Sequence, residues 1–450
     1  MGEATERPET RVLDTDVLVI GGGMAGMTAA ARATRRGARV VLVEVAPNLG
    51  GSATYAGYIW TAPSHEVMDV ENPQGGLELR RALVDRFSDG VDWIRQMDVL
   101  CGPEVTVAHV GRGHQFDTMH YVDQCRREVE RSGSVHLGAR VERLETHEGA
   151  VVGAEVTMAD GETCLVRASS TVLATGGFQA NPEMLVERVH PQADLMTLRS
   201  NPESRGTGLR LATSVGAATG PDDAGFYGHL VPSGITLDPS EFVALALYYS
   251  EHALLFNTEN RRFVDETIGD HLNNMALVTQ PGARGLLIAD ARVHRDWMTT
   301  AYVEGAISLD KFELAQKRGA RCGYAEELDE LAYLPEEWGY DGKAIRQAIE
   351  AHNEAARAGT AITPERSQDP LPLDEPPYYV IECVPGITFT FHGVTIDTSG
   401  RVLDTAGRPI PGLLAAGSDI GGLYNHAYLG GLASALIFGL AAADSATASS

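Results

Sequence analysis

The chain has 450 residues, of which 44% are hydrophobic, and a formal net charge of -25 at pH 7. This length favours two domains over one, and the apolar content is sufficient for buried cores. The excess of acidic residues argues against nucleic acid and anionic membrane surfaces as partners, because both would repel the protein.

Cysteine usage and the apolar tracts indicate a reduced protein without a membrane span. The five cysteines are scattered, and no pair has CxxC spacing, which excludes a zinc ribbon, a ferredoxin-type cluster and an attached c-type haem. The longest apolar tract, residues 429–443, is shorter than the roughly 20 residues that a span needs. Residues 1–11 are polar, lack a signal pattern and are expected to be disordered. We therefore expect a cytoplasmic protein.

The first regular pattern is a β-α-β unit that begins at Asp16. An apolar strand is predicted at 17–20, an Ala-rich helix at 24–36 and a second apolar strand at 39–44. A Gly-rich turn of the form GxGxxG joins the first strand to the helix. This order of strand, glycine turn and helix is typical of a dinucleotide-binding domain.

Each glycine of the turn has a physical role. Gly21 permits the tight turn, Gly23 lets the backbone approach a pyrophosphate, and Gly26 lets the helix pack closely on the strand. The N-terminus of the helix then stabilises the phosphate charge. Glu44, at the end of the second strand, is placed to bind ribose hydroxyls and argues against a 2′-phosphate.

The later chain contains further elements of an α/β protein. A hairpin is predicted around Asp160-Gly161, followed by a buried strand at 171–175. An amphipathic helix is predicted within 205–217, and a longer one at 341–359. The Pro-rich, acidic segment 363–377 reads as an exposed connection, after which strand-like patterns return.

Three later segments favour FAD over NAD. Residues 48–52 form a second glycine-containing loop, residues 174–177 close a buried strand, and residues 415–419 return late in the chain with a carboxylate. We expect that carboxylate, Asp419, to lie near ribityl hydroxyls.

The motifs VLVIGGGMAG, GGSATYAG, TVLATGGF, RGTGLRLA, NRRFVDE and LGGLASALIFG span nearly the whole chain. Together they resemble the flavoprotein family of fumarate reductases, succinate dehydrogenases and 3-ketosteroid dehydrogenases. The resemblance implies an α/β fold, in which a discontinuous Rossmann-type FAD-binding domain (1–223 and 389–450) is interrupted by an α+β capping domain (224–388). It implies an FAD site made of Gly21, Gly23, Met24, Ala25, Gly26, Glu44, Gly50, Gly51, Ser52, Val141, Ala174, Thr175, Gly176, Asp419, Gly430, Leu432, Ala433 and Ser434. Some relatives attach FAD to a His where this chain has Gly51, so non-covalent FAD is expected.

The departures from the fumarate-reducing members concern the substrate. Phe389 stands where they have a substrate-binding His, and Tyr428 stands where they have a carboxylate-binding Arg. Their proton-delivering Arg aligns with Asp270, next to His271. One family histidine is retained as His229. A Tyr hydroxyl cannot replace a bidentate Arg on a carboxylate. Before its glycine pair, Tyr428 instead resembles the ketone-binding Tyr of 3-ketosteroid dehydrogenases.

The resulting candidates are Tyr428, Asp270, His271 and His229 for catalysis, and Phe389, Phe391, His392 and Gly431 for substrate binding. Each also has a plainer interpretation, because buried Tyr and His side chains are often only packed and hydrogen-bonded. No metal-ligand spacing such as HExxH is present, so no metal is predicted.

The predicted function is FAD-dependent oxidation or reduction of a C–C bond next to a carbonyl, on a small hydrophobic ketone or enone. The electron partner would be external, since no second nucleotide motif and no haem or iron–sulfur motif is visible. Homo-oligomerisation is compatible with the sequence. Alternatives are a fumarate reductase-like enzyme for dicarboxylates, an amine oxidase or hydroxylase on the same FAD domain, and a non-catalytic FAD-binding partner subunit.

Overall fold

The first domain is built on an eight-stranded, mostly parallel sheet. The computed structural model describes residues 11–108, 110–301 and 308–448, so most of the segment predicted to be disordered lies outside it. The strand order is β20-β21-β9-β1-β2-β6, with β7 and β8 extending the sheet from β9. These strands are β1 (Arg11–Ile20), β2 (Val40–Glu44), β6 (Ser134–Leu137), β7 (Arg140–His147), β8 (Ala150–Thr157), β9 (Thr163–Leu173), β20 (Arg401–Leu403) and β21 (Pro409–Ala415).

The predicted β-α-β unit forms as expected. Strand β1 runs parallel to β2, and the helix between them is α1 (Met24–Arg35). The apolar end of β1 is buried on both faces, which a central parallel strand requires. The predicted hairpin is also present, since β8 pairs antiparallel with β9 across the turn that contains Asp160-Gly161.

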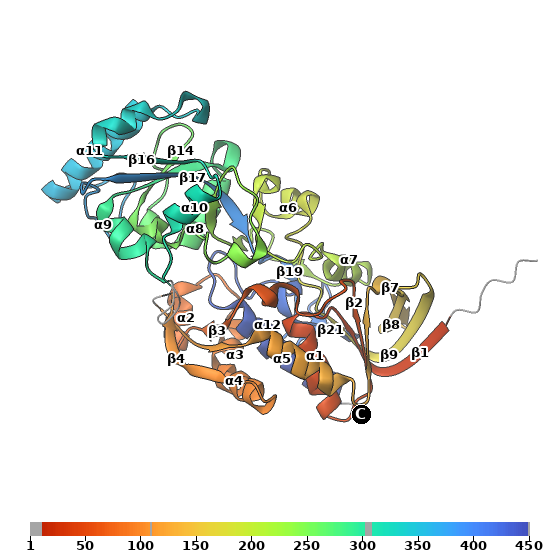
Figure 1. The fold of residues 1–450 in the computed structure, drawn as a ribbon. Helices are drawn as coiled ribbons and strands as arrows, with labels where there is room; N and C mark the ends of the chain where they lie inside the picture. Colours follow the sequence, from red (N-terminus) through yellow and green to blue (C-terminus); the bar gives the residue numbers. More distant parts are fainter. Residues whose placement is uncertain (1–10, 109, 302–307, 449–450) are drawn as a thin grey trace, which may run out of the picture.

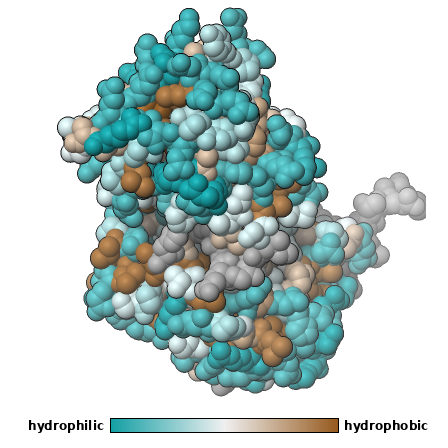
Figure 2. Space-filling view, turned by 60° about the vertical axis from the view of Figure 1, so that its left-hand side comes forward, coloured by the Kyte–Doolittle hydropathy of each residue, from teal (hydrophilic) through white to brown (hydrophobic). Residues whose placement is uncertain are grey.

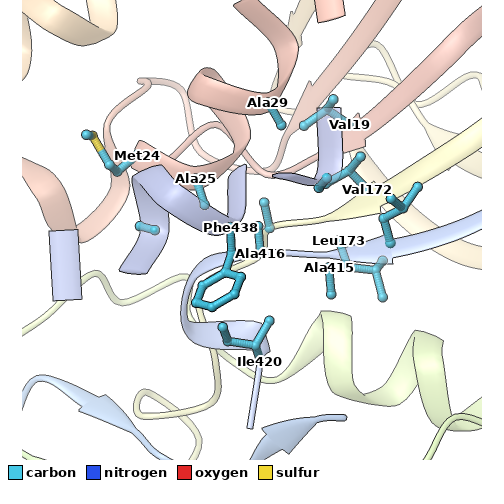
Figure 3. Close-up of a cluster of buried hydrophobic side chains, with 14 of the residues drawn as sticks. Val19, Met24, Ala25, Ala29, Val172, Leu173, Ala415, Ala416, Ile420 and Phe438 are labelled. Carbon is cyan, nitrogen blue, oxygen red and sulfur yellow. The ribbon is translucent and has the colours of Figure 1, made fainter. Parts of the chain in front are cut away.

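The C-terminal helix α12 (Gly431–Ala446) packs against α1 in the core of this domain (Figure 1). Figure 3 shows Phe438 of α12 near Ala25 of α1 and Ala416, which follows β21. Close packing depends on small residues, because a Cβ at Gly439 would lie 2.8 Å from the Ala25 carbonyl oxygen. The apolar tail is therefore a buried helix. In the part of the chain that the structure describes, we find no helix that could cross a membrane.

Shorter elements surround the main sheet. A three-stranded sheet, β3-β5-β4, lies beside α2 to α4. The helix predicted within 205–217 is α7 (Thr207–Ser214). The other elements are β3 (Tyr58–Thr61), β4 (Cys101–Val107), β5 (Gly111–Phe116), α2 (His65–Glu71), α3 (Leu77–Asp85), α4 (Phe87–Gln96), α5 (Thr118–Val129) and α6 (Pro182–Arg188).

The cap has its own sheet and its own core. Its strands pair in the order β10-β17-β15-β14, and β13 and β16 also pair with β17. Of these strands, β10 comes from the chain segment before residue 223. The predicted helix 341–359 is α11, which Asp341 caps and which ends at Gly359 in a left-handed conformation. The elements are β10 (Thr197–Leu198), β13 (Leu230–Pro232), β14 (Leu254–Asn257), β15 (Gly285–Ala289), β16 (Cys322–Ala325), β17 (Tyr378–Ile387), α8 (Asp270–Val278), α9 (Ala291–Val293), α10 (Lys311–Lys317) and α11 (Gly342–Ala358).

Two short strand pairs lie where the chain crosses between the domains, and the second of them joins the cap to the FAD-binding domain. β11 (Thr219–Gly220) pairs with β19 (Gly393–Val394), and β12 (Phe226–Tyr227) pairs with β18 (Phe389–Thr390). The cap core consists of residues between Leu230 and Cys383. We keep the boundaries after residues 223 and 388 as our proposal for the domain division. Figure 2 shows two lobes with mainly hydrophilic surfaces and small, separate hydrophobic patches.

Candidate active site

A cavity of ≈ 1100 Å³ lies between the two domains. Its lower wall comes from the loops that follow β1, β2, β9 and β21, together with the first turn of α12. The carboxyl ends of parallel strands meet at one edge of a sheet, which is where α/β proteins bind ligands. The upper wall comes from the cap, with Tyr227, His229 and Tyr248 among its residues.

The glycine turn has the shape that a pyrophosphate needs. A Cβ at Gly21 would lie 2.2 Å from the Ala174 carbonyl oxygen, and one at Gly26 would lie 1.9 Å from the Gly21 carbonyl oxygen. At Gly23, by contrast, the nearest atom would be 3.8 Å away, and this residue lines the cavity. Phosphate oxygens can therefore reach the backbone at Gly23 and the free N–H groups of α1.

Glu44, predicted to bind ribose, is fixed in place at the cavity wall. Its carboxylate accepts hydrogen bonds from the backbone N–H of Gly22 at 2.6 Å and of Ala46 at 2.8 Å, and it lines the cavity. Burial raises the pKa of this carboxyl, an effect that the two N–H donors oppose. Each oxygen still has a lone pair available to a hydroxyl donor.

The Asp419 carboxylate lies between the loops that follow β9 and β21. Its carboxylate accepts hydrogen bonds from the backbone N–H and the hydroxyl of Thr175, the latter at 2.9 Å, and from Gly177 N–H at 3.2 Å. It is 1% exposed and does not line the cavity, whereas its neighbour Ser418 does. The carboxylate ties the loop after β9 to the loop after β21, and a contact between Asp419 and the ribityl hydroxyls stays a prediction.

The remaining residues of the predicted FAD site divide into two groups. Those that line the cavity are Met24, Ala25, Gly51, Ser52, Val141, Ala174, Thr175, Gly176 and Leu432. Those that lie behind the cavity wall are Gly26, Gly50, Gly430, Ala433 and Ser434. The second group supports the wall, as at Gly430, where a Cβ would lie 1.7 Å from the Trp60 carbonyl oxygen.

Tyr428 and Gly431 meet at one point of the cavity wall. The Gly431 backbone N–H donates a hydrogen bond to the Tyr428 hydroxyl over 2.9 Å, and both residues line the cavity. Burial raises the pKa of Tyr428 to about 12, so its hydroxyl is protonated at neutral pH. The Tyr428 ring is held by Tyr227, stacked at a centroid distance of 3.5 Å, and by the edge contact of Trp60 at 5.3 Å.

Tyr227, His229 and Asp270 form a chain of side-chain contacts that begins at the cavity wall and ends behind it. Its hydroxyl lies 2.8 Å from His229 Nε2, and His229 Nδ1 contacts the Asp270 carboxylate. His229 lines the cavity, and Asp270 lies behind it at 7% exposure. Burial lowers the pKa of His229, and the Asp270 carboxylate opposes that shift. A neutral His229 that donates to Asp270 can accept a proton from the Tyr227 hydroxyl.

Besides Asp270, three of the predicted catalytic and substrate-binding residues do not line the cavity. His271 has a buried Nε2 without a hydrogen-bond partner among the described residues. Burial lowers the pKa of His271. His392 is 1% exposed and bonds to the Pro221 carbonyl oxygen through Nδ1 at 2.9 Å. Phe391 packs against Tyr424 and Phe389. Their catalytic or substrate-binding roles stay predictions, and in this structure other groups form the cavity wall. Phe389 does line it.

Sequence reasoning missed several residues that line the cavity. Aromatic side chains dominate this group, and two buried cations accompany them. Tyr227 was visible only as the neighbour of a family histidine, and the cations carry no motif at all. These residues are Trp60, Arg199, Tyr227, Phe242 and Lys311. Within the described residues, no cluster of metal-ligating side chains is present.

Comparisons with known proteins place the chain in a family. A family model described as FAD binding domain matches residues 16–434. A fumarate reductase (cytochrome) of Shewanella frigidimarina is 30% identical over 459 residues, covering 96% of this chain and 76% of that protein. A flavocytochrome c3 fumarate reductase in an open conformation has a TM-score of 0.73 at 25% identity, over 97% of this chain and 78% of that one.

The fold is shared more widely. 3-Ketosteroid-Δ4-(5α)-dehydrogenase from Rhodococcus jostii RHA1, solved with 4-androstene-3,17-dione, has a TM-score of 0.76 at 21% identity, over 99% of this chain and 98% of that one. The glycine turn, Glu44 and the cavity provide the groups that FAD requires. The chain therefore belongs to the FAD-binding flavoprotein family of fumarate reductases and succinate dehydrogenases, and it is an FAD-dependent oxidoreductase.

Proposed function

We propose that this enzyme oxidises or reduces a C–C bond adjacent to a carbonyl group. The observation that carries the proposal is the meeting of the Tyr428 hydroxyl and the Gly431 N–H at the cavity wall, 2.9 Å apart. The Gly431 N–H donates to the Tyr428 hydroxyl oxygen and so makes the hydroxyl proton a stronger donor to a substrate carbonyl oxygen. This donor would stabilise the enolate character that develops when hydrogen leaves or joins the neighbouring carbons.

FAD, held non-covalently, supplies the two-electron chemistry by exchanging a hydride with a substrate carbon. The residues that would hold it are the α1 turn, Glu44 and the loop that contains Gly51 and Ser52. Electrons would come from, or pass to, an external partner. The five cysteines are all free, which supports a reducing, cytoplasmic location.

Tyr227 is our candidate for the proton at the α-carbon. Its hydroxyl lines the cavity wall beside Tyr428 and is hydrogen-bonded to His229. In reduction it would donate a proton to the α-carbon and be reprotonated through His229. In desaturation the proton would travel the opposite way. Asp270 acts as a positioning residue, because it contacts His229 and keeps Nε2 free to face Tyr227.

The cavity walls favour a substrate with a hydrophobic body. Trp60, Phe242, Tyr248 and Phe389 line it with Tyr227 and Tyr428, and flat aromatic walls suit a ring or a conjugated chain.

The direct test is the visible spectrum of the flavin under anaerobic conditions. The oxidised holoenzyme is mixed with saturated cyclic ketones, and the dithionite-reduced holoenzyme is mixed with the matching enones. Bleaching by ketones or reoxidation by enones would support the proposal. A flavin that responds to neither class, but is oxidised by fumarate, would overturn it.

A fumarate reductase-like activity is the second candidate. It is supported by the 30% identity to the Shewanella frigidimarina fumarate reductase. Against it stands the side chain at 428, where a Tyr cannot form the bidentate contact that an Arg gives a carboxylate. Fumarate is therefore included as an acceptor in the same experiment.

A further inference from the structure

Two buried cations line the cavity on its cap side. Lys311, the first residue of α10, is 6% exposed, and Arg199, which follows β10, is 5% exposed. Both belong to the same cavity wall as Tyr227 and His229. Lys311 Nζ lies 5.2 Å from the centroid of the Tyr248 ring, and Tyr248 in turn contacts His229 at a centroid distance of 4.7 Å. The cations therefore lie one side chain beyond the proposed proton path.

Neither cation has a carboxylate partner among the residues that the structure describes. Lys311 Nζ donates to the Ala244 carbonyl oxygen at 3.3 Å. Arg199 donates to the Phe242 carbonyl oxygen and, at 3.2 Å, to the Thr388 hydroxyl, while its Nε is buried without a hydrogen-bond partner.

The neighbouring carboxylates are occupied elsewhere. Asp310, adjacent to Lys311, accepts from the Glu313 N–H and contacts His294 at 2.8 Å. Glu241, adjacent to Phe242, lies 3.3 Å from Arg318. Burial and the charge of Arg199 together lower the pKa of Lys311 to about 8, as expected of a cation that lacks an anion.

Buried charges in proteins are normally paired, because leaving water is costly for an ion. Two buried cations that lack a carboxylate partner among the described residues therefore require an explanation, and the cavity itself provides one. We propose that the substrate carries an anionic group, a carboxylate or a phosphate, that binds Arg199 and Lys311 at the cap end of the cavity.

This inference rests on the proposed function and deepens it. The reacting carbonyl would lie at Tyr428 and Gly431, and the anion would lie at the far end of a hydrophobic body. It also alters the expectation from the sequence, which was a wholly uncharged substrate. An Arg guanidinium and a Lys ammonium together match the charge and donor needs of either anion.

The test uses matched enones as oxidants of the reduced holoenzyme. 4-(4-Carboxyphenyl)but-3-en-2-one is compared with its methyl ester and with the 4-phosphate analogue, by stopped-flow reoxidation of the flavin. The enone is the same in all three, so only the distal group differs. We expect the carboxylate or the phosphate to have a Kd lower than that of the ester by roughly 10- to 100-fold.

Variants then assign the effect to the cavity. Lys311→Met should remove most of the preference for the anion, so that the Kd of the carboxylate approaches that of the ester. Lys317→Met is the matched control, because Lys317 lies on the same helix but its side chain is 67% exposed and pairs with Glu313. Arg199→Lys tests the second cation while keeping its charge.

The outcomes separate the two proposals. If none of the three enones reoxidises the flavin, the proposed function fails. If all three react with equal affinity, the function stands and the anion site is wrong. If Lys311→Met weakens FAD binding, measured by the flavin-to-protein ratio, but leaves the preference for the anion intact, the cations serve the cofactor and the inference is overturned.

Discussion

At the scale of single residues, the proposed function assigns two tasks to two stacked tyrosines. Tyr428, whose hydroxyl accepts from the Gly431 N–H, would bind the substrate carbonyl, whereas Tyr227 is connected to His229 and Asp270. Their rings are nearly parallel, with an interplanar angle of 19°. Each hydroxyl can therefore be removed without removing the ring that supports the other.

Tyr428→Phe should keep the flavin and lose most of the activity. The ring still packs against Trp60 and Tyr227, but the carbonyl loses one donor, which lowers kcat by roughly 10²–10³. Tyr424→Phe is the control, because Tyr424 is buried behind the cavity, where its hydroxyl donates to the Gly430 carbonyl oxygen. Steady-state kinetics with the enone identified above measures both variants. Unchanged turnover in Tyr428→Phe would remove this residue from the mechanism.

Asp270→Asn should shift the pH dependence of kcat while the protein still folds. The Asp270 carboxylate raises the pKa of His229 against the effect of burial, so an amide in its place lowers that pKa. If neutral His229 relays the proton, the acid limb of kcat moves to lower pH. A reduced kcat with an unmoved limb would show that Asp270 only supports packing.

Lys311 should make anion binding weaken with rising pH. Its cation binds the anionic substrate, and its pKa is lowered to about 8, so the Kd of the carboxylate enone should rise as pH passes that value. Arg199, Tyr248, His229 and Asp270 also surround this part of the cavity. The methyl ester controls for their titration, since it needs no cation. A Kd for the carboxylate that stays constant from pH 7 to 9 would contradict this prediction.

At the scale of elements, α1 and the loops around it explain why the glycine turn has its sequence. Two of its glycines are required by packing within the protein, and a third leaves space for the ligand. The same motif therefore combines a folding requirement with a binding requirement, and substitution can separate them.

Gly26→Ala and Gly23→Ala should fail in different ways. A methyl group at Gly26 would collide with the Gly21 carbonyl oxygen, at 1.9 Å, so we expect the FAD-free protein to lose about 1–3 kcal/mol of stability or more. A methyl group at Gly23 meets no protein atom within 3.8 Å and projects where the pyrophosphate must approach. That variant should keep the Tm of the FAD-free protein and bind FAD more weakly. Equal Tm losses in both variants would contradict the distinction.

At the scale of the whole molecule, two separate cores meet at the cavity. The cap core also contains a buried ionic cluster, in which Glu266 accepts from Arg262 at 2.8 Å and from Arg366 at 3.2 Å. Glu266 is 0% exposed, so its charge is fully removed from water. Because the FAD-binding glycines lie in the other domain, damage to this cluster should leave the cofactor site intact.

Glu266→Gln should therefore destabilise the cap without weakening FAD binding. Two arginines would lose their shared anion, at a cost of about 3–5 kcal/mol. Thermal unfolding and FAD titration of the same sample measure the two effects, and exposed Glu354→Gln on α11 is the control. A parallel fall in FAD affinity would show that the two domains do not respond independently.

The fold was predictable from the sequence where the signal is local. The β-α-β unit, the hairpin at Asp160-Gly161 and helix α11 all form as predicted, since each depends on periodicity and turn chemistry within a short segment. Asp419 shows the limit of such reasoning. The sequence pattern did not predict its hydrogen bonds with Thr175, because Thr175 lies 244 residues away in the sequence.

The sequence by itself determined the glycine turn of the β-α-β unit and the family, because these follow from motifs whose residues are close along the chain. Only the tertiary structure joined Asp270 to His229, 41 residues earlier, and placed Arg199 and Lys311 in one cavity wall. The reason is that the pairing of β12 with β18 and the fold of the cap bring distant segments to one surface. Side-chain direction and burial at that surface arise from packing, which no local pattern specifies.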